Sequence, residues 1–348
     1  MGNKVNLRMS KPLISVVFSV YNGAPYLKEA IESILNQTFT DFEFIIVDDG
    51  STDETPKILD GFTDTRIVRL KNEKNLGLVR SLNKALNLAK GEFIARMDAD
   101  DISLPERFAK QVTYLEKHPE VGVLGTAISQ VDKRGRPISV LVPPIHHELI
   151  FWQMFFVCPI FHPTVMMRRK VLAVVGYYDV NFTHVEDIEL WSRLLLNRTK
   201  FANLLEALHI RRLHSRSIIS TQSAVQYQRG IIIRQRLLKS FLGYAVPADI
   251  VAWFLRFDRP LSRGRRAATL ALLLELHDKV VQVDSVSIEE QESLQTDLAY
   301  RITLVNQSWP RFLLRRLILY LGKILPVPSR HKLKVFLSKY LKWFLLQK

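Results

Sequence analysis

Cysteine is almost absent from this chain of 348 residues, and Cys158 stands alone. A single thiol excludes an intrachain disulfide and suits a reducing compartment. The sequence also lacks an uncharged apolar run of the ~18 residues that a membrane-spanning helix needs. The first ten residues lack the apolar middle region of a secretory signal. Together these absences favour a cytoplasmic protein.

Acidic residues are missing from Trp309 to the C-terminus, and the whole chain carries a formal net charge of +15. Such an excess fits either nucleic acid or an anionic membrane as a partner. No helix-turn-helix, zinc-finger or aromatic RNA-binding motif accompanies the basic residues, so we expect no nucleic-acid binding. Hydrophobic residues make up 47% of the chain, which excludes disorder, and the length favours two domains.

Strand and helix patterns alternate regularly over the first third of the chain. Apolar, β-rich runs predict strands at 13–20, 43–47, 66–70 and 93–97. Amphipathic segments predict helices at 25–37, 52–61, 77–90 and 103–118. Gly91 is expected to stop the third helix, and Ser103 with Glu106 forms a capping-box pattern before the fourth. This alternation is typical of an α/β fold with a parallel sheet covered by helices on both faces.

The pattern changes after Val121. Strands are predicted at 121–128, 138–141 and 164–167, and helices at 146–156 and 186–197. Beyond about Thr221 only helical spacing remains. We therefore expect a domain with a mostly parallel sheet over residues 11–221 and a basic helical region over residues 222–348.

Two clusters of aspartates directly follow predicted strands. Asp48 and Asp49 follow the strand at 43–47, and the strand at 93–97 leads into Asp98, Asp100 and Asp101. The carboxyl ends of neighbouring parallel strands converge on one crevice, where open α/β sheets bind ligands. Carboxylates so close together repel one another unless a cation neutralises them. Hard oxygen ligands suit Mg²⁺ or Mn²⁺ shared with phosphate, so the pattern predicts an enzyme that handles a nucleotide diphosphate.

Short segments spread over the first two thirds of the chain carry a family resemblance. They lie at 15–22, 47–53, 95–101, 161–166, 176–179 and 185–191. In this order and spacing they resemble the GT-A fold of the family 2 glycosyltransferases, and the resemblance covers roughly residues 11–221. One position departs from the family pattern, because Ser19 stands where proline is usual. This change affects backbone stiffness and removes no reactive group.

The resemblance implies that Ser19, Tyr21 and Asp48 surround the base of a nucleotide. A carboxylate accepts hydrogen bonds from an imide or a sugar hydroxyl, and a tyrosine ring stacks on a base. Turn chemistry after a strand is an ordinary structural explanation for Asn22, and capping explains Asp49. We therefore expect Asp49 to stabilise the turn and Asp48 to bind the nucleotide.

The resemblance also implies a metal site. It gives Asp100 a direct contact with the ion, and Asp98 a contact with the ribose or the ion. Residues i and i+2 leaving a strand point the same way, so both carboxylates can reach one Mg²⁺ or Mn²⁺ ion. Arg96 is expected to pair with these acids or with phosphate of the nucleotide sugar. His214 resembles the family's closing segment, where a neutral imidazole can bind the metal, but a solvated basic loop explains it equally well.

Glu186 and Asp187 precede a helix with an apolar face. By resemblance Asp187 is the base that deprotonates the acceptor hydroxyl in an inverting transfer, and Glu186 orients that base or the acceptor. Such a base contributes about 10²–10⁴-fold to the rate. The helix dipole also favours acids in any first turn, so a purely structural explanation stays open. His162 likewise fits either a structural histidine or an acceptor contact.

The C-terminal region shows a different pattern. Segments 311–321 and 331–348 gather lysines and arginines on one side of a helical projection, opposite apolar and aromatic residues. A basic amphipathic helix with aromatic residues fits an anionic bilayer surface. Its apolar face can instead pack on the catalytic domain. We favour a peripheral position on the inner face of the cell membrane.

The resemblance as a whole implies a metal-dependent, inverting glycosyltransferase. Such an enzyme moves a sugar from a nucleotide-diphosphate donor to a hydroxyl of a glycan or lipid-linked acceptor in cell-surface polysaccharide synthesis. The alternative is a non-catalytic, membrane-associated scaffold of the same fold. The presence of all the expected carboxylates favours the enzyme.

Overall fold

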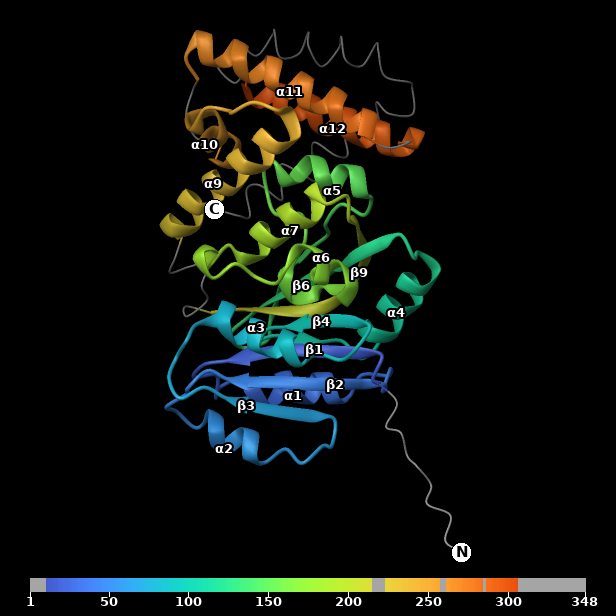
Figure 1. The fold of residues 1–348 in the computed structure, drawn as a ribbon, viewed down its shortest axis with the longest axis vertical. Helices are drawn as coiled ribbons and strands as arrows, with labels where there is room; N and C mark the ends of the chain where they lie inside the picture. The colour runs from blue at the N-terminus through green and yellow to red at the C-terminus, as the bar shows by residue number, and fades with distance from the viewer. Residues whose placement is uncertain (1–10, 215–222, 257–260, 284–285, 306–348) are drawn as a thin grey trace, which may run out of the picture. The chain divides into compact units, whose positions relative to one another are not determined.

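A computed structural model describes residues 11–214, 223–256, 261–283 and 286–305 (Figure 1). Nine strands within these ranges form one mixed sheet in the order β3-β2-β1-β4-β8-β6-β9-β5, with β7 paired to β6. The strands are β1 (Ile14–Val20), β2 (Phe42–Asp48), β3 (Ile67–Lys71), β4 (Phe93–Met97), β5 (Ile102–Ser103), β6 (Val121–Asp132), β7 (Pro137–Leu141), β8 (Met166–Arg168) and β9 (Lys200–Leu213).

Helices separate these strands and make up the described part of the C-terminal region. The helices among the strands are α1 (Leu27–Leu35), α2 (Thr55–Asp60), α3 (Leu78–Leu88), α4 (Arg107–Lys117), α5 (His147–Met154), α6 (Arg169–Val175) and α7 (Glu186–Leu196). Those that follow are α9 (Ser223–Leu242), α10 (Ala248–Arg256), α11 (Arg263–Val283) and α12 (Ile288–Val305). The predicted α/β class with a helical C-terminal region is confirmed.

Four parallel strands, β3, β2, β1 and β4, form one part of the sheet (Figure 1). In the register Val20 lies beside Asp48, and Phe18 lies beside Met97. The carboxyl ends of β1, β2 and β4 therefore lie next to one another. Beyond β4 the strand β8 is antiparallel, and β6 pairs antiparallel with β8 but parallel with β9.

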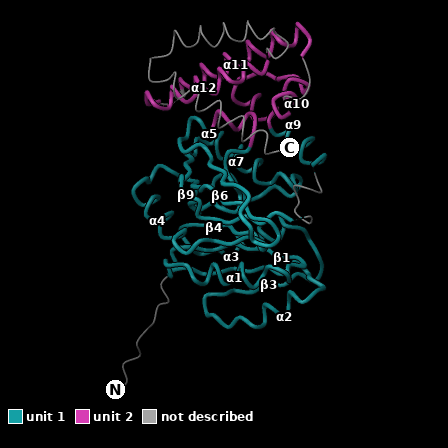
Figure 2. The backbone as a smooth tube through the Cα atoms, turned by 180° about the vertical axis from the view of Figure 1, so that it is seen from behind, with its two compact units in different colours: residues 1–150, 158–233 teal, residues 151–157, 234–348 magenta. Residues whose placement is uncertain are grey.

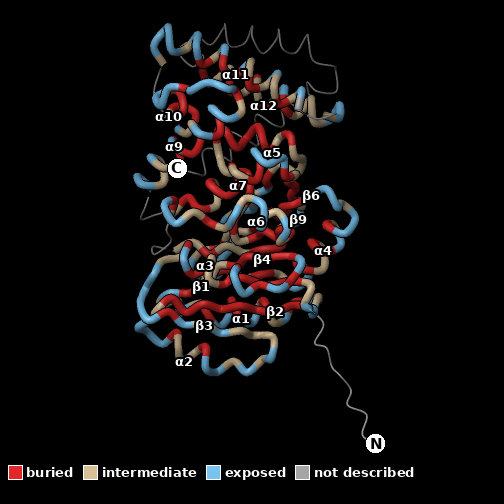
Figure 3. Tube along the Cα trace, in the orientation of Figure 1, coloured by how far each residue is buried: buried red, intermediate tan, exposed pale blue. Residues whose placement is uncertain are grey.

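Helices cover both faces of the parallel strands. Alternate strand residues pack with α1 and α4 in one core, which includes Val16, Phe18, Phe44, Ile46, Ala95, Ala30, Ile31, Ile34, Phe108 and Val112. The intervening residues, such as Val17 and Ile45, are also buried, and α3 packs on β1 and β2. Burial on two faces explains why β1, β2 and β4 are mostly apolar (Figure 3).

Two predicted helix signals are wrong. Helix α3 ends at Leu88 with Ala89 as its C-terminal flanking residue, so Gly91 does not stop it. A Cβ at Gly91 would lie 2.5 Å from the backbone nitrogen of Ser15, so the glycine allows the start of β4 to approach β1. The capping box is not formed either, because Ser103 lies in β5 and its hydroxyl accepts a hydrogen bond from Gln37 Nε2 at 3.2 Å.

The sequence patterns also missed three elements. The short strand β5, the helix α6 and the long strand β9 have no counterpart among the expected segments. The pairing of β9 with β6 has three register shifts, so its in-and-out side-chain pattern is irregular. An irregular strand gives a weak period-two signal, which explains why β9 was not predicted.

The chain divides into two compact units (Figure 2). The first comprises residues 1–150 and 158–233, and the second comprises residues 151–157 and 234–348. Within the second unit the indole of Trp152 donates a hydrogen bond to Asp297 Oδ2 at 2.5 Å, and the Arg301 guanidinium lies 3.4 Å from the centre of the Phe156 ring. The expected domain boundary near residue 221 stays a prediction.

Two expectations concern membranes. Among the helices that the structure describes, none combines the length and apolar character needed to cross a bilayer. The basic amphipathic segments at 311–321 and 331–348 lie outside the described residues.

Candidate active site

The loops after β1 and β2 are joined by hydrogen bonds. Asn22 N donates to Ser51 Oγ at 3.0 Å, and Thr52 N donates to Asn22 Oδ1 at 2.9 Å. Asn22 has a positive φ of 51°, a left-handed conformation that asparagine tolerates better than most residues. The turn explanation for Asn22 therefore agrees with its geometry. Tyr21, just before it, is 48% exposed and can meet a ligand.

The two aspartates after β2 have different partners. Asp49 accepts hydrogen bonds from the backbone nitrogens of Leu76 at 2.8 Å and Gly77 at 2.9 Å, so it anchors the start of α3. Asp48 is 3% exposed and accepts from Ser51 N at 2.9 Å through Oδ1. Asp48 thus shapes the turn as well as standing at the strand ends. The contacts of Ser19, Tyr21 and Asp48 with a nucleotide base stay predictions.

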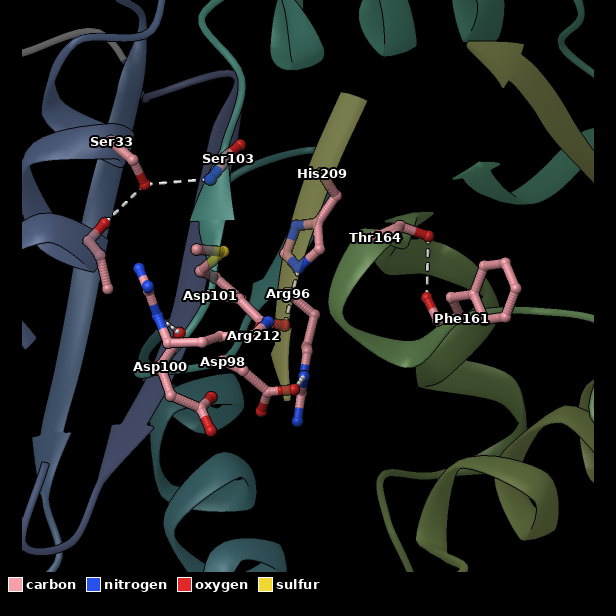
Figure 4. Close-up of polar contacts among 12 residues, drawn as sticks. Ser33, Arg96, Asp98, Asp100, Asp101, Ser103, Phe161, Thr164, His209 and Arg212 are labelled. Carbon is pink, nitrogen blue, oxygen red and sulfur yellow. Dashed lines mark hydrogen bonds and ion pairs between the residues drawn. The ribbon is translucent and has the colours of Figure 1, made fainter. Parts of the chain in front are cut away.

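Three aspartates form a cluster after β4 (Figure 4). One carboxylate oxygen from each of Asp98, Asp100 and Asp101 lies within 4.8 Å of the others. Asp101 is 3% exposed, and both of its oxygens are engaged, by His209 Nε2 at 2.8 Å and by Arg212 N at 3.0 Å. It therefore ties the loop to β9. Asp98 and Asp100 have side chains 34% and 37% exposed, so they are the members available to a ligand.

The charges in this cluster repel one another. Burial and the Asp98 carboxylate raise the pKa of Asp100 to about 6 and the pKa of Asp101 to about 7. A divalent cation would relieve this repulsion, and carboxylate oxygens are its preferred ligands. The donor set therefore fits Mg²⁺ or Mn²⁺. His214 Nε2 lies 2.8 Å from Asp100 Oδ2, so the structure brings the predicted histidine to the predicted metal ligand.

The end of β9 is held against α1. The Arg212 guanidinium pairs with Glu29 at 2.6 Å, donates from Nε to the backbone oxygen of Asp100 at 3.3 Å and lies 4.7 Å from the centre of the Tyr26 ring. The ring of His214 lies 5.3 Å from that same ring. Tyr26 and Glu29 were missed by sequence reasoning, and no local pattern marks them, because their partners lie more than 180 positions away.

Arg96 lies beneath the aspartate cluster. It is 2% exposed, and its guanidinium nitrogen is 2.5 Å from Asp98 Oδ2. Burial lowers the pKa of Arg96, but the negative charges of Asp98 and Glu186 outweigh it, and the pKa is raised. The pKa of Arg96 is therefore raised by carboxylates from two separate elements, the loop after β4 and the start of α7. Its contact with a nucleotide sugar stays a prediction, and its burial favours an indirect role through Asp98.

Glu186 and Asp187 begin helix α7. Glu186 is 6% exposed, and its Oε2 has no hydrogen-bond partner among the described residues. Burial, followed by repulsion from Asp187, raises the pKa of Glu186 to about 7. Asp187 is less buried, and its Oδ1 accepts from Ile188 N at 2.8 Å. Glu186 is thus an enclosed group, while Asp187 is the more accessible one.

A buried aromatic group supports α7. His162 Nε2 lies 2.7 Å from the Tyr178 hydroxyl, and the His162 ring packs edge-to-face on Trp191 with 5.9 Å between ring centres. His162 is 8% exposed, and burial lowers its pKa. These contacts agree with the structural interpretation of His162. Burial and the charges of Glu186, Asp187 and Asp98 raise the pKa of Tyr178, although Arg96 opposes them.

One surface cavity of about 420 Å³ lies elsewhere. It is at the amino ends of β1 and β4, opposite the aspartate clusters, and is lined by Lys11, Lys90, Glu92, Arg168, Arg169, Lys170 and Ala173. It contains none of the predicted site residues.

Comparison with known proteins shows the family to which the chain is similar. The profile described as Glycosyl transferase family 2 matches residues 15–176. An uncharacterized glycosyltransferase of Methanocaldococcus jannaschii is 39% identical over 198 residues, which are 56% of this chain and 68% of that protein. The O-antigen biosynthesis glycosyltransferase WbnJ of Escherichia coli is 33% identical over 240 residues, 66% of this chain and 93% of that protein.

A solved structure shows the same fold. Residues 1–349 of TarS from S. aureus, in complex with UDP-GlcNAc, superpose with a TM-score of 0.56 at 20% identity, covering 84% of this chain and 83% of that one. The sequence similarities show that this chain belongs to glycosyl transferase family 2 and is a glycosyltransferase.

Proposed function

We propose that the chain is a metal-dependent, inverting glycosyltransferase. It moves a sugar from a nucleotide-diphosphate donor to a hydroxyl of a glycan or lipid-linked acceptor. The observation that carries this proposal is the cluster of carboxylates after β4. One oxygen from each of Asp98, Asp100 and Asp101 lies within 4.8 Å of the others, and His214 Nε2 lies 2.8 Å from Asp100 Oδ2.

The donor side of the site lies at the carboxyl ends of the parallel strands. Tyr21 and Asp48 would meet the nucleotide there. Asp98, Asp100 and His214 would hold Mg²⁺ or Mn²⁺, because their oxygen and nitrogen atoms are suitable ligands and lie together. A bound cation would supply neutralisation of the charge on the departing diphosphate. TarS was solved with UDP-GlcNAc, which is a donor of this class.

The acceptor side depends on Asp187. Its carboxylate takes the proton from the acceptor hydroxyl while that oxygen attacks the anomeric carbon, and the bond to the diphosphate breaks. Arg96 and Tyr178 are both buried, and the charges of Asp98 and Glu186 act on both side chains. They would hold the Asp98 side chain and the pair of Glu186 and Asp187 at a fixed separation during transfer.

Two further parts of the proposal concern the cell. The relative WbnJ is named for O-antigen biosynthesis, which supports a role in cell-surface polysaccharide synthesis. The basic pattern of residues 309–348 supports attachment to the inner face of an anionic membrane. The family membership favours this enzyme over a non-catalytic scaffold of the same fold.

Replacement of Asp187 by asparagine tests the base. We expect Asp187→Asn to lower kcat by roughly 10²–10⁴-fold, because an amide cannot accept the proton. A panel of nucleotide sugars, screened by thermal shift with and without Mn²⁺, first identifies the donor. Release of nucleoside diphosphate in the presence of acceptor then measures turnover.

Two other variants make this test specific. Asp60→Asn is the matched control, because that carboxylate is 78% exposed and pairs only with Arg69 in the described structure; it should retain activity. Asp100→Ala should instead weaken the Mn²⁺-dependent part of nucleotide binding. Full turnover by Asp187→Asn would remove Asp187 from the role of base.

A further inference from the structure

The first turns of helix α9 belong to the first compact unit. The helix runs from Ser223 to Leu242, and its residues up to Ile233 are assigned to that unit. They lie against the loop that precedes α7, and this loop leads directly into the acid pair of Glu186 and Asp187. Nothing in the proposed chemistry uses these residues, so their contacts need a separate explanation.

Two polar side chains of α9 bind consecutive backbone carbonyls of this loop. Gln226 Nε2 donates to the carbonyl oxygen of His184 at 3.1 Å. Arg229 Nη1 donates to the carbonyl oxygen of Thr183 and also to its hydroxyl. Residues three apart share one face of a helix, so both donors point to the same side of α9.

An apolar contact continues the same face. Ile233 is 2% exposed and packs with Phe182 and Val185, and the partly buried Ile188 of α7 joins them. Positions 226, 229 and 233 follow the spacing i, i+3, i+7 of one helical face. The contact therefore extends from the loop into the first turn of α7.

The loop itself has a conformation that needs support. His184 has a φ of 72°, in the left-handed region that residues other than glycine adopt only at a cost in free energy. The residue that flanks the start of α7, Val185, offers no side-chain capping bond. The carbonyls held by α9 belong to the residues just before Glu186 and Asp187. A shift of this loop therefore moves the acid pair.

We propose that Gln226, Arg229 and Ile233 form a latch that positions Asp187 for its reaction with the acceptor. We call this face of α9 the base latch. The inference rests on the proposed role of Asp187 as base and adds positioning residues from a segment outside the family-matched range of residues 15–176. In the described structure these side chains contact the loop before α7 and its first turn, and the latch acts through the loop at 183–185.

Arg229→Gln is the main test, made in the full chain. It removes the charge-assisted bonds to Thr183 but keeps a polar side chain on α9. We expect kcat to fall roughly 10- to 100-fold with an unchanged KM for the donor, because a small misplacement of a reacting group lowers the rate without changing donor contacts. We also expect faster amide hydrogen exchange over residues 182–187.

Several variants separate positioning from loss of folding. Arg229→Lys keeps one donor to the Thr183 carbonyl and should recover part of kcat. Gln226→Ala removes only the neutral hydrogen bond to the His184 carbonyl, and it replaces Arg229→Gln as the test variant if that protein folds poorly. Gln228→Ala, exposed on the same helix, and Arg134→Gln, exposed on the turn between β6 and β7, are matched controls and should leave kcat and exchange unchanged.

The outcomes distinguish this inference from the proposed function. Full turnover by Asp187→Asn would overturn the role of the base itself and, with it, the purpose of the latch. An inactive Asp187→Asn together with a fully active Arg229→Gln would overturn the latch alone. Unchanged hydrogen exchange over residues 182–187 in Arg229→Gln would also overturn it, whatever happens to kcat.

Discussion

At the scale of single residues, burial decides the charge of Glu186. Its carboxyl has an ordinary pKa of 4.5, and burial with repulsion from Asp187 raises the pKa to about 7. The folded state therefore holds a proton on Glu186 at pH values where the unfolded chain has lost it. Between pH 4.5 and about 7 the stability contributed by this proton falls as the pH rises.

This titration predicts a pH-dependent difference between two proteins. Glu186→Gln cannot titrate, so it avoids the loss of stability that the parent suffers as the pH rises. Relative to the parent, its free energy of unfolding should increase by an amount on the order of 1–3 kcal/mol between pH 4.5 and about pH 8. Urea denaturation followed by circular dichroism at both pH values measures the change.

The aspartates of the cluster after β4 do not confuse this comparison. Asp100 and Asp101 also have raised pKa values, but they titrate in both proteins and cancel in the difference. If the two stability curves ran parallel from pH 4.5 upwards, the proton on Glu186 would be absent from the folded state.

Residue patterns predicted the aspartate cluster but not its individual partners. A strand followed by Asp98, Asp100 and Asp101 is visible in the sequence, because the acids are neighbours in the chain. Which of them is enclosed depends on His209 and Arg212, which lie more than a hundred positions away. The local pattern therefore predicted the site. Long-range contacts distinguish Asp101, which holds β9, from Asp98 and Asp100, which are partly exposed.

At the scale of elements, close approach of β4 and β1 explains a glycine. Gly91 N donates to Ser15 Oγ at 2.8 Å, and an added Cβ would also lie 2.7 Å from the backbone carbon of Ile14. Backbone atoms cannot move aside as a flexible side chain can. The glycine is therefore a requirement of sheet packing rather than a helix stop.

Gly91→Ala should destabilise the protein. We expect the free energy of unfolding to fall by about 1–3 kcal/mol, as for other substitutions that overfill a packed site. Gly264→Ala in α11 is the matched control, because nothing lies within 4 Å of its added Cβ, and it should be neutral or stabilising by up to about 1 kcal/mol. Chemical denaturation of both variants measures the difference. Equal stability of the two variants would contradict the packing argument.

Elements with strong local periodicity were predicted, and elements defined by pairing were not. The strands β1, β2 and β4 and the amphipathic helix α3 follow from the spacing of their apolar residues. Strand β5 has two residues, and β9 changes register along its length, so neither carries a regular period. Their existence depends on the partner strand that supplies the hydrogen bonds.

At the scale of the whole molecule, the C-terminal region predicts membrane association. Deletion of residues 309–348 should abolish sedimentation with vesicles of phosphatidylglycerol and phosphatidylcholine, because it removes a basic, acid-free stretch. Vesicles of phosphatidylcholine alone should bind neither protein. A neutral protein of about the size of lysozyme is the control for protein that the vesicle pellet traps without binding. Unaltered sedimentation of the shortened chain with anionic vesicles would refute the membrane role of this stretch.

The sequence by itself determined the class of fold, the family and the strand ends at which the acids stand. Periodicity and short motifs are local, and the chain carries them before it folds. Only the tertiary structure decided that Arg96 is buried under Asp98, that Asp101 ties a loop to β9, and that α9 holds the loop before Asp187. The last two relations join residues far apart in the chain, which come together only when it folds, and the burial of Arg96 depends on the elements that pack around it.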